Sequence, residues 1–364
     1  MTGLLPEGFH DRLPPFADAA ARLERRVLDA AFAHGYEQVD PPLVEFEGAL
    51  THRLKAGGAR DSVRFVDPVS QATLAVRPDI TAQVGRIAAT RMGHHPRPVR
   101  LSYAGAVVRL RGGKIRPERA ARQIGCELIG RDSVAAAREV VGVAIEALQA
   151  AGLEGLSIDF TLPDLLAELA GDMAPDTLAA LREALDGKDA AGVAAIDRAY
   201  LPLIEAAGPF DAALARLRES AHGAALKTRL DGLAEIAASV PAGVALTLDP
   251  TERHGFEYQS WLGFSLFQTG VPVEVGRGGS YAIVHDDGAE EPAIGFSLYA
   301  DAILDAGLAP VERRRLFVPV GADPAAAAEL RRQGWVTVAA LEGEDTPAAQ
   351  LCTHILTPEG PEPA

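Results

Sequence analysis

The chain has 364 residues, of which 48% are hydrophobic and 23% are charged, and this composition excludes a disordered, fibrous or collagen-like protein. Its length predicts two or three domains, at ~150 residues each. With 35 Lys and Arg residues against 50 Asp and Glu residues, the formal net charge is −15, which makes nucleic acid an unfavourable partner because an acidic surface repels phosphate backbones.

No part of the sequence indicates export, a membrane span or a disulfide framework. The N-terminal residues lack a basic region followed by an apolar run, and apolar stretches stay short of the ~18 residues that a membrane span needs. The two cysteines, Cys126 and Cys352, are far apart and lack the paired spacing of a zinc site. We expect a cytoplasmic protein that binds no metal and contacts no membrane.

Helices and short strands alternate in the first part of the chain. Residues 16–34 predict an amphipathic helix that ends at Gly35, and the paired prolines within residues 36–46 favour an extended segment. The elements expected next, in chain order, are strands at 63–66 and 73–76, a helix at 79–91, strands at 99–103, 107–110 and 123–129, a helix at 134–151 and a strand at 156–160.

The pattern changes at residue 162, where alanine- and leucine-rich segments predict an inserted helical subdomain that reaches residue 240. We expect the strands that follow to share one antiparallel sheet with the first block. They lie at 244–248, 261–267, 271–275 and 293–296, and a helix then runs to Leu304.

A separate small unit is expected beyond Pro310. It is predicted to be a β-α-β unit with strands at 316–320 and 335–338 and a helix at 324–332, which Asp323 caps. The Pro-rich residues 357–364 predict a frayed tail. The expected domains are a core over residues 1–310, which contains the helical insertion at 162–240, and a small unit over residues 311–364.

Two short segments carry residues that are common in binding sites. Residues 276–281 contain several glycines and resemble a phosphate-cradling loop, but they lack the strand-loop-helix spacing of nucleotide-binding motifs. We therefore interpret them as a turn between strands. His94 and His95 are adjacent, and neighbouring side chains of an extended chain point in opposite directions, so we expect exposed loop histidines and no metal site.

A third set of polar residues interrupts apolar strands and the start of a helix. These residues are Arg77, Asp79, Thr81, Arg109, Gln123 and Glu127. Polar groups at inward positions are costly unless they pair with one another or with a ligand. Two hypotheses follow: Asp79 and Thr81 cap a helix while the charges pair internally, or the set binds a ligand. The residue pattern alone favours the first.

Six segments, in this order, resemble the motifs of histidyl-tRNA synthetases, which are class II aminoacyl-tRNA synthetases. They are residues 76–82 (VRPDITA), 107–111 (VVRLR), 122–130 (RQIGCELIG), 255–258 (GFEY), 278–281 (GGSY) and 293–296 (AIGF). Residues 16–46 resemble that family's dimer-forming motif 1. The resemblance covers about residues 1–308. It implies an α+β fold, with a class II aminoacyl-tRNA synthetase-like antiparallel sheet flanked by helices, a helical insertion and a small C-terminal α/β unit.

The same resemblance implies that ATP handling is lost. Arg109 matches the family's arginine that holds the α-phosphate of ATP, but Arg111 stands where the family has a glutamate. Ala121 stands in place of the phenylalanine that stacks on adenine, and Leu298 in place of the second ATP-clamping arginine. We therefore expect no adenylation.

A histidine pocket is the second implication of the resemblance. Its residues would be Asp79, Thr81, Arg109, Gln123, Glu127 and Tyr258. Asp79, Thr81 and Gln123 would receive the α-ammonium group, and Glu127 would accept a hydrogen bond from the imidazole. Gln259 stands in place of a second pocket tyrosine, and His254 in place of the arginine of the histidine-binding loop.

Within this family the chain resembles the regulatory subunits of ATP phosphoribosyltransferase, chiefly in residues 77–79 and 127–130. That likeness implies a non-catalytic protein without a cofactor, which forms a homodimer through motif 1 and joins the short-form catalytic subunit in a hetero-octamer. It implies a role in the first step of histidine biosynthesis and in feedback inhibition by histidine. The alternative is a histidine-tRNA ligase or another histidine-activating enzyme with degenerate motifs. The residues after Pro310 are too few for a tRNA anticodon domain, so we expect no nucleic-acid partner.

Overall fold

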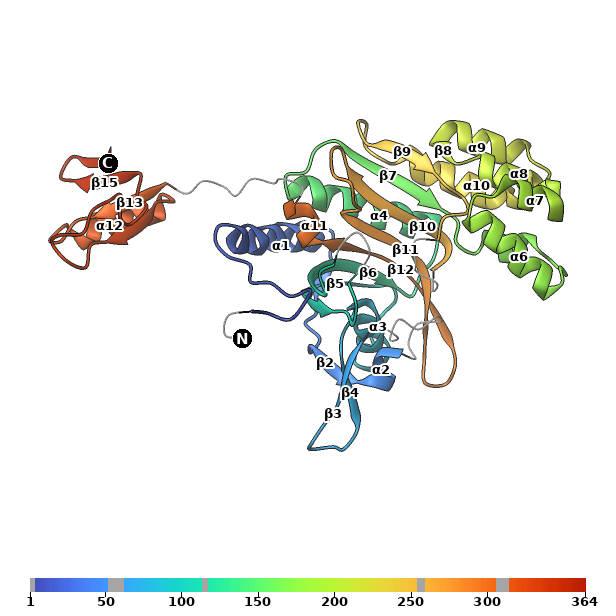
Figure 1. The fold of residues 1–364 in the computed structure, drawn as a ribbon, viewed down its shortest axis with the longest axis horizontal. Coiled ribbons are helices and arrows are strands. Elements are labelled where there is room, and N and C mark those ends of the chain that lie inside the picture. The colour runs from blue at the N-terminus through green and yellow to red at the C-terminus, as the bar shows by residue number, and fades with distance from the viewer. Residues whose placement is uncertain (1–3, 52–61, 113–116, 254–258, 306–313) are drawn as a thin grey trace. The chain divides into compact units, whose positions relative to one another are not determined.

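The computed structural model describes residues 4–51, 62–112, 117–253, 259–305 and 314–364 (Figure 1). The chain divides into two compact units, Met1–Leu308 and Ala309–Ala364. None of the helices in the described part of the chain combines the length and the apolar character needed to cross a membrane.

The larger unit is organised around a sheet of nine described strands. Their bounds are β1 Glu37–Gln38, β5 Val99–Val108, β6 Ala120–Ile129, β7 Leu156–Thr161, β8 Gly208–Pro209, β9 Ala245–Leu248, β10 Gln259–Gln268, β11 Gly276–Val284 and β12 Glu290–Tyr299. The strand order is β1-β5-β6-β12-β11-β10-β7-β9-β8. The described neighbours are antiparallel apart from the parallel pairs β1–β5 and β7–β9. The predicted α+β fold with one largely antiparallel sheet is confirmed.

Helices and a second sheet complete this unit. Its helices are α1 Phe16–Ala33, α2 Glu47–Thr51, α3 Thr81–Thr90, α4 Val134–Ala150, α5 Leu165–Leu169, α6 Pro175–Asp186, α7 Ala190–Ile196, α8 Leu201–Glu205, α9 Phe210–Glu219, α10 Gly223–Ala238 and α11 Ala300–Asp305, with a 3₁₀ turn at Arg198–Tyr200. Three strands, β2 Val44–Phe46, β3 Val63–Val66 and β4 Thr73–Val76, form the second sheet in the order β2-β4-β3. The helices α5 to α10 fall within the segment that we expected to be a helical insertion.

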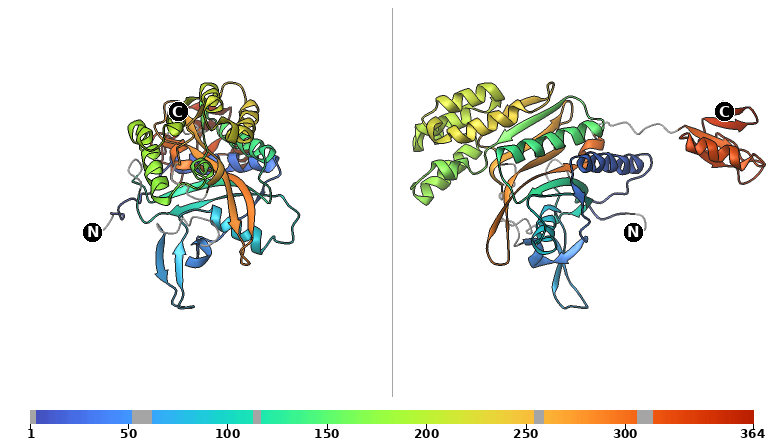
Figure 2. Two further views of the ribbon diagram at one scale, coloured as in Figure 1. Left: turned by 90° about the vertical axis from the view of Figure 1, so that its right-hand side faces the viewer. Right: turned by 180° about the vertical axis from the view of Figure 1, so that it is seen from behind.

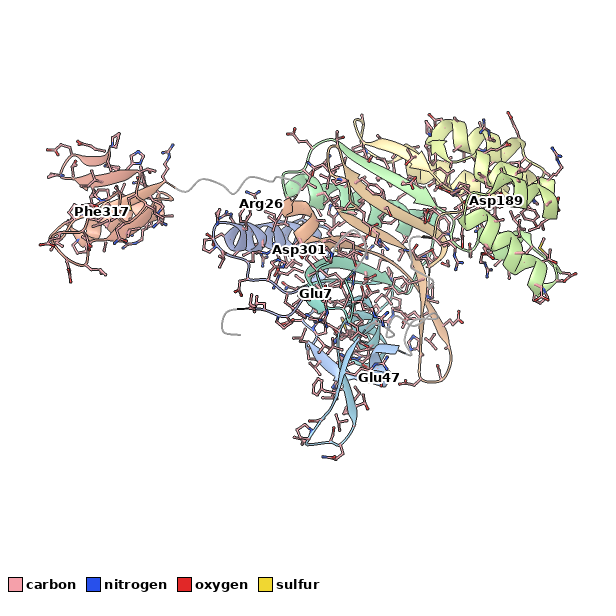
Figure 3. All side chains as sticks on the ribbon, in the orientation of Figure 1. Glu7, Arg26, Glu47, Asp189, Asp301 and Phe317 are labelled. Carbon is pink, nitrogen blue, oxygen red and sulfur yellow. The ribbon has the colours of Figure 1, made fainter. Side chains whose placement is uncertain are left out.

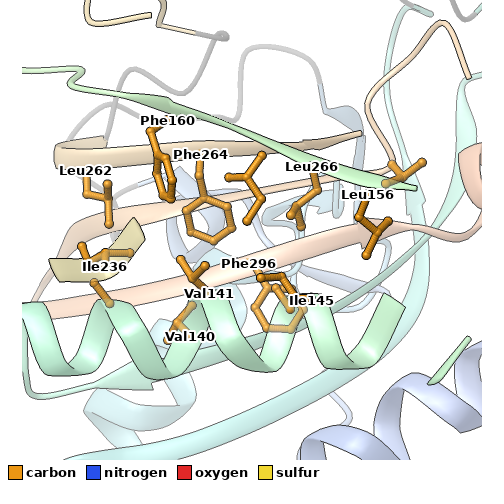
Figure 4. Close-up of a cluster of buried hydrophobic side chains, with 14 of the residues drawn as sticks. Val140, Val141, Ile145, Leu156, Phe160, Ile236, Leu262, Phe264, Leu266 and Phe296 are labelled. Carbon is orange, nitrogen blue, oxygen red and sulfur yellow. The ribbon is translucent and has the colours of Figure 1, made fainter. Parts of the chain in front are cut away.

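The two faces of the main sheet differ in what covers them. The helices α1 and α4 lie side by side on one face (Figure 2). There Val140, Val141 and Ile145 of α4 pack towards phenylalanines of the sheet (Figure 4). On β6, Ile124, Cys126 and Leu128 belong to this core. Because side chains of a strand alternate between faces, the intervening Gln123 and Glu127 point to the opposite face, where α3 packs.

Two sequence predictions in the middle of the sheet are wrong. Residues 99–103 and 107–110 were expected to form two strands, but β5 continues from Val99 to Val108. The small residues between the two expected strands belong to β5. At one of them, Gly105, a Cβ atom would lie 2.1 Å from the guanidinium of Arg77. A glycine is needed here because a buried arginine packs across the strand.

The glycine-rich residues 276–281 are also not a turn. They begin β11, which pairs with β10 and β12, whereas the expected strand at 271–275 is irregular. A Cβ atom at Gly278 would lie 2.3 Å from the ring of Phe264, and one at Gly279 would lie 2.6 Å from the carbonyl oxygen of Leu262. These glycines therefore allow close packing and do not mark a reversal of the chain.

The smaller unit contains β13 Arg315–Val318, α12 Pro324–Arg332, β14 Val336–Ala339, β15 His354–Thr357 and β16 Gly360–Pro363. Asp323 caps α12 as expected, because its carboxylate accepts a hydrogen bond from the Ala325 N–H at 2.9 Å. The strand order is β14-β13-β15-β16, so the unit is more than a β-α-β motif. The expected frayed tail is wrong: β16 is an edge strand, where prolines are tolerated, and it pairs with β15.

Candidate functional site

A cluster of polar side chains lies on the face of the main sheet that α3 covers. Its members are Asp79, Thr81, Tyr103, Gln123, Glu127, Tyr281 and Ser297. All of them are buried except Asp79, which is partly exposed. They come from the start of α3 and from the strands β5, β6, β11 and β12, so distant parts of the sequence supply one site.

The start of α3 is fixed by two of the predicted site residues. The Ile80 N–H donates to Gln123 Oε1 at 3.0 Å, and the Thr81 N–H donates to Asp79 Oδ1 at 2.7 Å. Gln123 also donates to the other oxygen of Asp79, at 2.8 Å, and to Ser297 Oγ, at 2.7 Å. Asp79 precedes the N-cap residue Ile80 and bonds the first N–H of α3, whereas Thr81 is the first residue of the helix and does not cap it. The same contacts draw Asp79 and Gln123 into the polar cluster.

Glu127 is the buried acid of the cluster, with 1% of its surface exposed. Its carboxyl accepts hydrogen bonds from Tyr103 OH at 3.0 Å and from Tyr281 OH at 2.7 Å. Burial raises the pKa of Glu127 from 4.5 to about 8; the charge of Asp79 adds to this rise, and the tyrosine hydroxyls oppose it. The carboxyl is therefore largely protonated at pH 7 in this arrangement, and a ligand that donates an N–H or carries positive charge would favour its ionised form.

Tyr103 connects the members of the cluster, and sequence reasoning missed it. Its hydroxyl lies 3.0 Å from Ser297 Oγ and 3.3 Å from Thr81 Oγ1, in addition to its bond with Glu127. Tyr103 pairs across the strands with Gly125, where a Cβ atom would lie 2.4 Å from the hydroxyl. A signal was present in the sequence, since Gly125 sits between two inward polar residues and leaves room for a large side chain from the neighbouring strand.

Tyr281 and Ser297 were the other site residues that the residue pattern did not identify. Tyr281 lies on β11 and Ser297 lies on β12, and both strands also carry glycines that line the site. Of these glycines, Gly295 leaves the least room for a side chain. A Cβ atom at Gly295 would lie 1.7 Å from Glu127 Oε2. The glycines of β11 and β12 thus shape the space around the Glu127 carboxyl.

A small cavity of ~20 Å³ adjoins Glu127. The residues that line it are Thr81, Glu127, Gln259, Arg277, Gly278, Gly279, Tyr281, Gly295, Phe296 and Ser297. This volume is enough for about one water molecule. Gln259 is one of these lining residues, and its amide donates to the Gly278 carbonyl at 3.0 Å.

Arg109, one of the predicted site residues, is not part of this cluster. Arg109 is exposed just after β5, and its backbone N–H donates to the Arg119 carbonyl at 2.7 Å. The described contacts join its side chain to neither Asp79 nor Glu127, so its place in the pocket stays a prediction. Tyr258 lies outside the described residues.

The three positions expected to mark lost ATP contacts differ in their surroundings. Arg111 is exposed, and Ala121 is partly buried on the same face as Gln123. Next to it, the Arg122 N–H donates to Asp301 of α11, which Figure 3 labels, at 2.8 Å. Leu298 is fully buried in the apolar core on the other side of β12 from Ser297. The inference from Leu298 is therefore wrong, because a side chain there does not face the pocket.

The described residues contain no group of three or more His, Cys, Asp or Glu side chains that could hold a metal ion. The site instead presents hydrogen-bond donors and acceptors around one buried acid. This arrangement can bind a small polar ligand.

Known proteins are similar to this chain in both sequence and fold. A family model described as histidyl-tRNA synthetase matches residues 8–303. The ATP phosphoribosyltransferase regulatory subunit of Paramagnetospirillum magneticum is 42% identical, over 98% of this chain and 97% of that protein. A solved ATP phosphoribosyltransferase regulatory subunit/histidyl-tRNA synthetase from Bacillus halodurans superposes with a TM-score of 0.77 at 21% identity and covers 96% of both chains. A chain of the ATP phosphoribosyl transferase (HisG:HisZ) complex from Thermotoga maritima gives a TM-score of 0.60 at 16% identity, over 77% of this chain and 97% of that chain.

Proposed function

The chain belongs to the regulatory subunits of ATP phosphoribosyltransferase within the histidyl-tRNA synthetase family, and we propose that it binds the short-form catalytic subunit and makes the complex sensitive to histidine. The prediction of a regulatory subunit that is not itself an enzyme is confirmed by the names of its curated relatives. Membership of this family implies a role in histidine biosynthesis.

The observation that carries the histidine proposal is the closed network around Glu127. Four of the six residues predicted for a histidine pocket, Asp79, Thr81, Gln123 and Glu127, meet in one buried cluster. Two carboxyl groups and several hydroxyl oxygens provide acceptors for an ammonium group and for an imidazole N–H. The exposed Arg109 and Arg111 and the small Ala121 offer no comparable assembly for a nucleotide.

The small volume of the cavity supports a regulatory role for ligand binding. Histidine is far larger than the ~20 Å³ beside Glu127, and in this proposal it enters when lining side chains such as Gln259 move. A ligand that binds only the opened pocket shifts the protein towards that state. Inhibition then needs the opened and closed states to differ in their effect on the partner, with a typical coupling of about 1–3 kcal/mol.

We propose a homodimer through the motif 1 region, within a hetero-octamer that contains the catalytic subunit. Phe16 and Phe32 of α1 are 51% and 70% exposed, and Phe46 at the end of β2 is 56% exposed. Exposed apolar side chains of this size favour burial against another chain. The name of the Thermotoga maritima complex, in which a chain of this fold occurs, supports assembly with a catalytic partner.

The proposal is tested by phosphoribosyl-ATP formation with the matching short-form catalytic subunit, measured with and without this chain over a histidine titration. We expect higher turnover when the chain is present, and histidine inhibition that requires it. Asp79→Asn should weaken the inhibition while assembly persists, and Glu329→Gln on the exposed face of α12 is the matched control. Unchanged turnover, together with histidine-dependent pyrophosphate exchange by this chain alone, would instead support a histidine-activating enzyme.

A further inference from the structure

Arg277 is a cation within the pocket face that neither the residue pattern nor the resemblance assigned to the site. Side chains two apart on a strand share a face, so Arg277, Gly279 and Tyr281 of β11 point to the same side of the sheet. Tyr281 reaches Glu127, and Arg277 lines the same small cavity as Glu127. The guanidinium therefore belongs to the pocket.

The neighbours of Arg277 on the sheet are polar. Its Cα partners are Ser297 on β12 and Ser265 on β10. Ser297 Oγ accepts a hydrogen bond from Gln123 at 2.7 Å, so Arg277 is one strand away from the network that holds Asp79. The side chain of Arg277 is only 21% exposed, which strengthens its electrostatic interactions relative to those of a surface arginine.

A carboxylate of the same chain already occupies the Arg277 guanidinium. Glu274, three residues earlier, forms an ion pair with it and is 19% exposed. Glu274 also accepts a hydrogen bond from Ser265 Oγ at 3.3 Å. Arg277 thus presents a geometry that holds one carboxylate, and the planar fork of an arginine suits this task.

The pocket face carries both a cation and an acid, the two partners that a zwitterionic amino acid requires. At ~3.3 Å per residue along a strand, the Arg277 Cα lies about 7 Å from that of Gly279. Gly279 pairs with Gly295, against which the Glu127 carboxyl packs. Arg277 and Glu127 therefore present a cation and an acid to one cavity, where a single amino acid can contact both.

We propose that Arg277 receives the carboxylate of the amino-acid effector, and that Glu274 is the internal carboxylate which the effector replaces. This assignment rests on the proposed histidine sensitivity. It gives the pocket the carboxylate-binding cation that its other described members lack, and it makes Arg277 the residue that separates amino acids from amines. Exchange of one carboxylate for another keeps the guanidinium paired in both states, and the displaced Glu274 still has Ser265 Oγ as a hydrogen-bond donor.

The test compares L-histidine with L-histidinol, in which a hydroxymethyl group replaces the carboxylate, by calorimetric titration of the full-length chain. The wild type should bind L-histidine about 10- to 100-fold more tightly than L-histidinol, the effect of one charge-assisted hydrogen bond in a buried site. Arg277→Gln should reduce this ratio to about 1 by weakening only L-histidine binding, and Arg277→Lys should restore part of it. Thermal unfolding of each variant checks that the fold is kept.

Glu274→Gln separates the proposal from a purely structural ion pair. If Glu274 competes with the effector, its removal should strengthen L-histidine binding and leave L-histidinol binding unchanged. If the ion pair only supports β11, both variants should weaken both ligands equally, and that outcome would overturn the assignment. An unchanged ratio in Arg277→Gln, or no L-histidine binding by the wild type, overturns it as well. Stimulation of the catalytic subunit in the absence of histidine is a separate readout, so regulatory function can persist when this assignment fails.

Discussion

Replacing Glu127 by glutamine tests the central electrostatic feature of the pocket. The side chain is 1% exposed, and its carboxyl accepts hydrogen bonds from two tyrosines. Burial raises its pKa from 4.5 to about 8, so the folded chain keeps a proton that the unfolded chain releases between these pH values. The free energy of unfolding should therefore fall as the pH rises from 4.5 to about 8. Outside this window, Glu127 should add nothing to the pH dependence of the unfolding free energy.

The size of this effect follows from the width of the window. Each pH unit contributes 1.36 kcal/mol, so a rise in pKa from 4.5 to about 8 gives an upper bound of about 5 kcal/mol. Glutamine is neutral at every pH and nearly the same size. Glu127→Gln should therefore lose this term, while the pH dependence from all other groups stays common to both proteins.

Urea unfolding at intervals between pH 5 and pH 8.5, followed by tryptophan fluorescence, measures the difference. Trp261 reports on the larger unit and Trp335 on the smaller one, so a Trp335→Phe background restricts the signal to the unit that contains Glu127. The unfolding free energies of the wild-type protein and the Glu127→Gln variant, both in this background, should converge at low pH and diverge by several kcal/mol near pH 8. Parallel curves over the whole range would refute the reasoning.

Three other outcomes are expected. Gly295→Ala should cost about 1–3 kcal/mol of unfolding free energy and abolish histidine sensitivity, since its Cβ would lie 1.7 Å from Glu127 Oε2. Gly142→Ala in α4, where a Cβ atom would meet nothing within 4 Å, is the matched control and should raise the thermal midpoint; equal losses in both variants would contradict the argument. Leu298→Ala should destabilise the chain by about 2–5 kcal/mol in denaturant and leave histidine affinity nearly unchanged, because Leu298 is buried on the other face of β12; a large loss of affinity at retained fold would place it in the pocket. Histidine binding near pH 7 should release protons if Glu127 ionises on contact, and calorimetry in buffers of different ionisation enthalpy should detect them; equal heats in all buffers would exclude this linkage.

Periodicity predicted the elements that pack on the apolar core, and it failed where packing depends on a distant residue. The helix α4 was predicted because Val140, Val141 and Leu148 repeat at helical spacing. The strand β11 was not, because Gly278 and Gly279 are typical of turns unless one knows that Phe264 and Leu262 approach them from the neighbouring strand. No local pattern contains that information.

The site shows the same limit in its chemistry. Asp79, Gln123 and Glu127 were identified because polar residues at inward positions need partners. Their partners Tyr103 and Tyr281 come from other strands, and a tyrosine in a strand is equally typical of an ordinary core. Only the register of β5 against β6, which pairs Tyr103 with Gly125, brings the hydroxyl to Glu127.

The buried network itself argues for a ligand. A buried polar cluster that is fully hydrogen-bonded contributes little net stability, and well-packed apolar residues of the same volume often stabilise a fold as much or more. The main core already provides an apolar interior on the opposite face of the sheet. Packing alone therefore gives no reason to bury Glu127 at a pKa near 8, with two tyrosines and two glycines arranged around it. A ligand that supplies the missing positive charge gives that reason, and the stability lost at high pH should be regained when such a ligand binds.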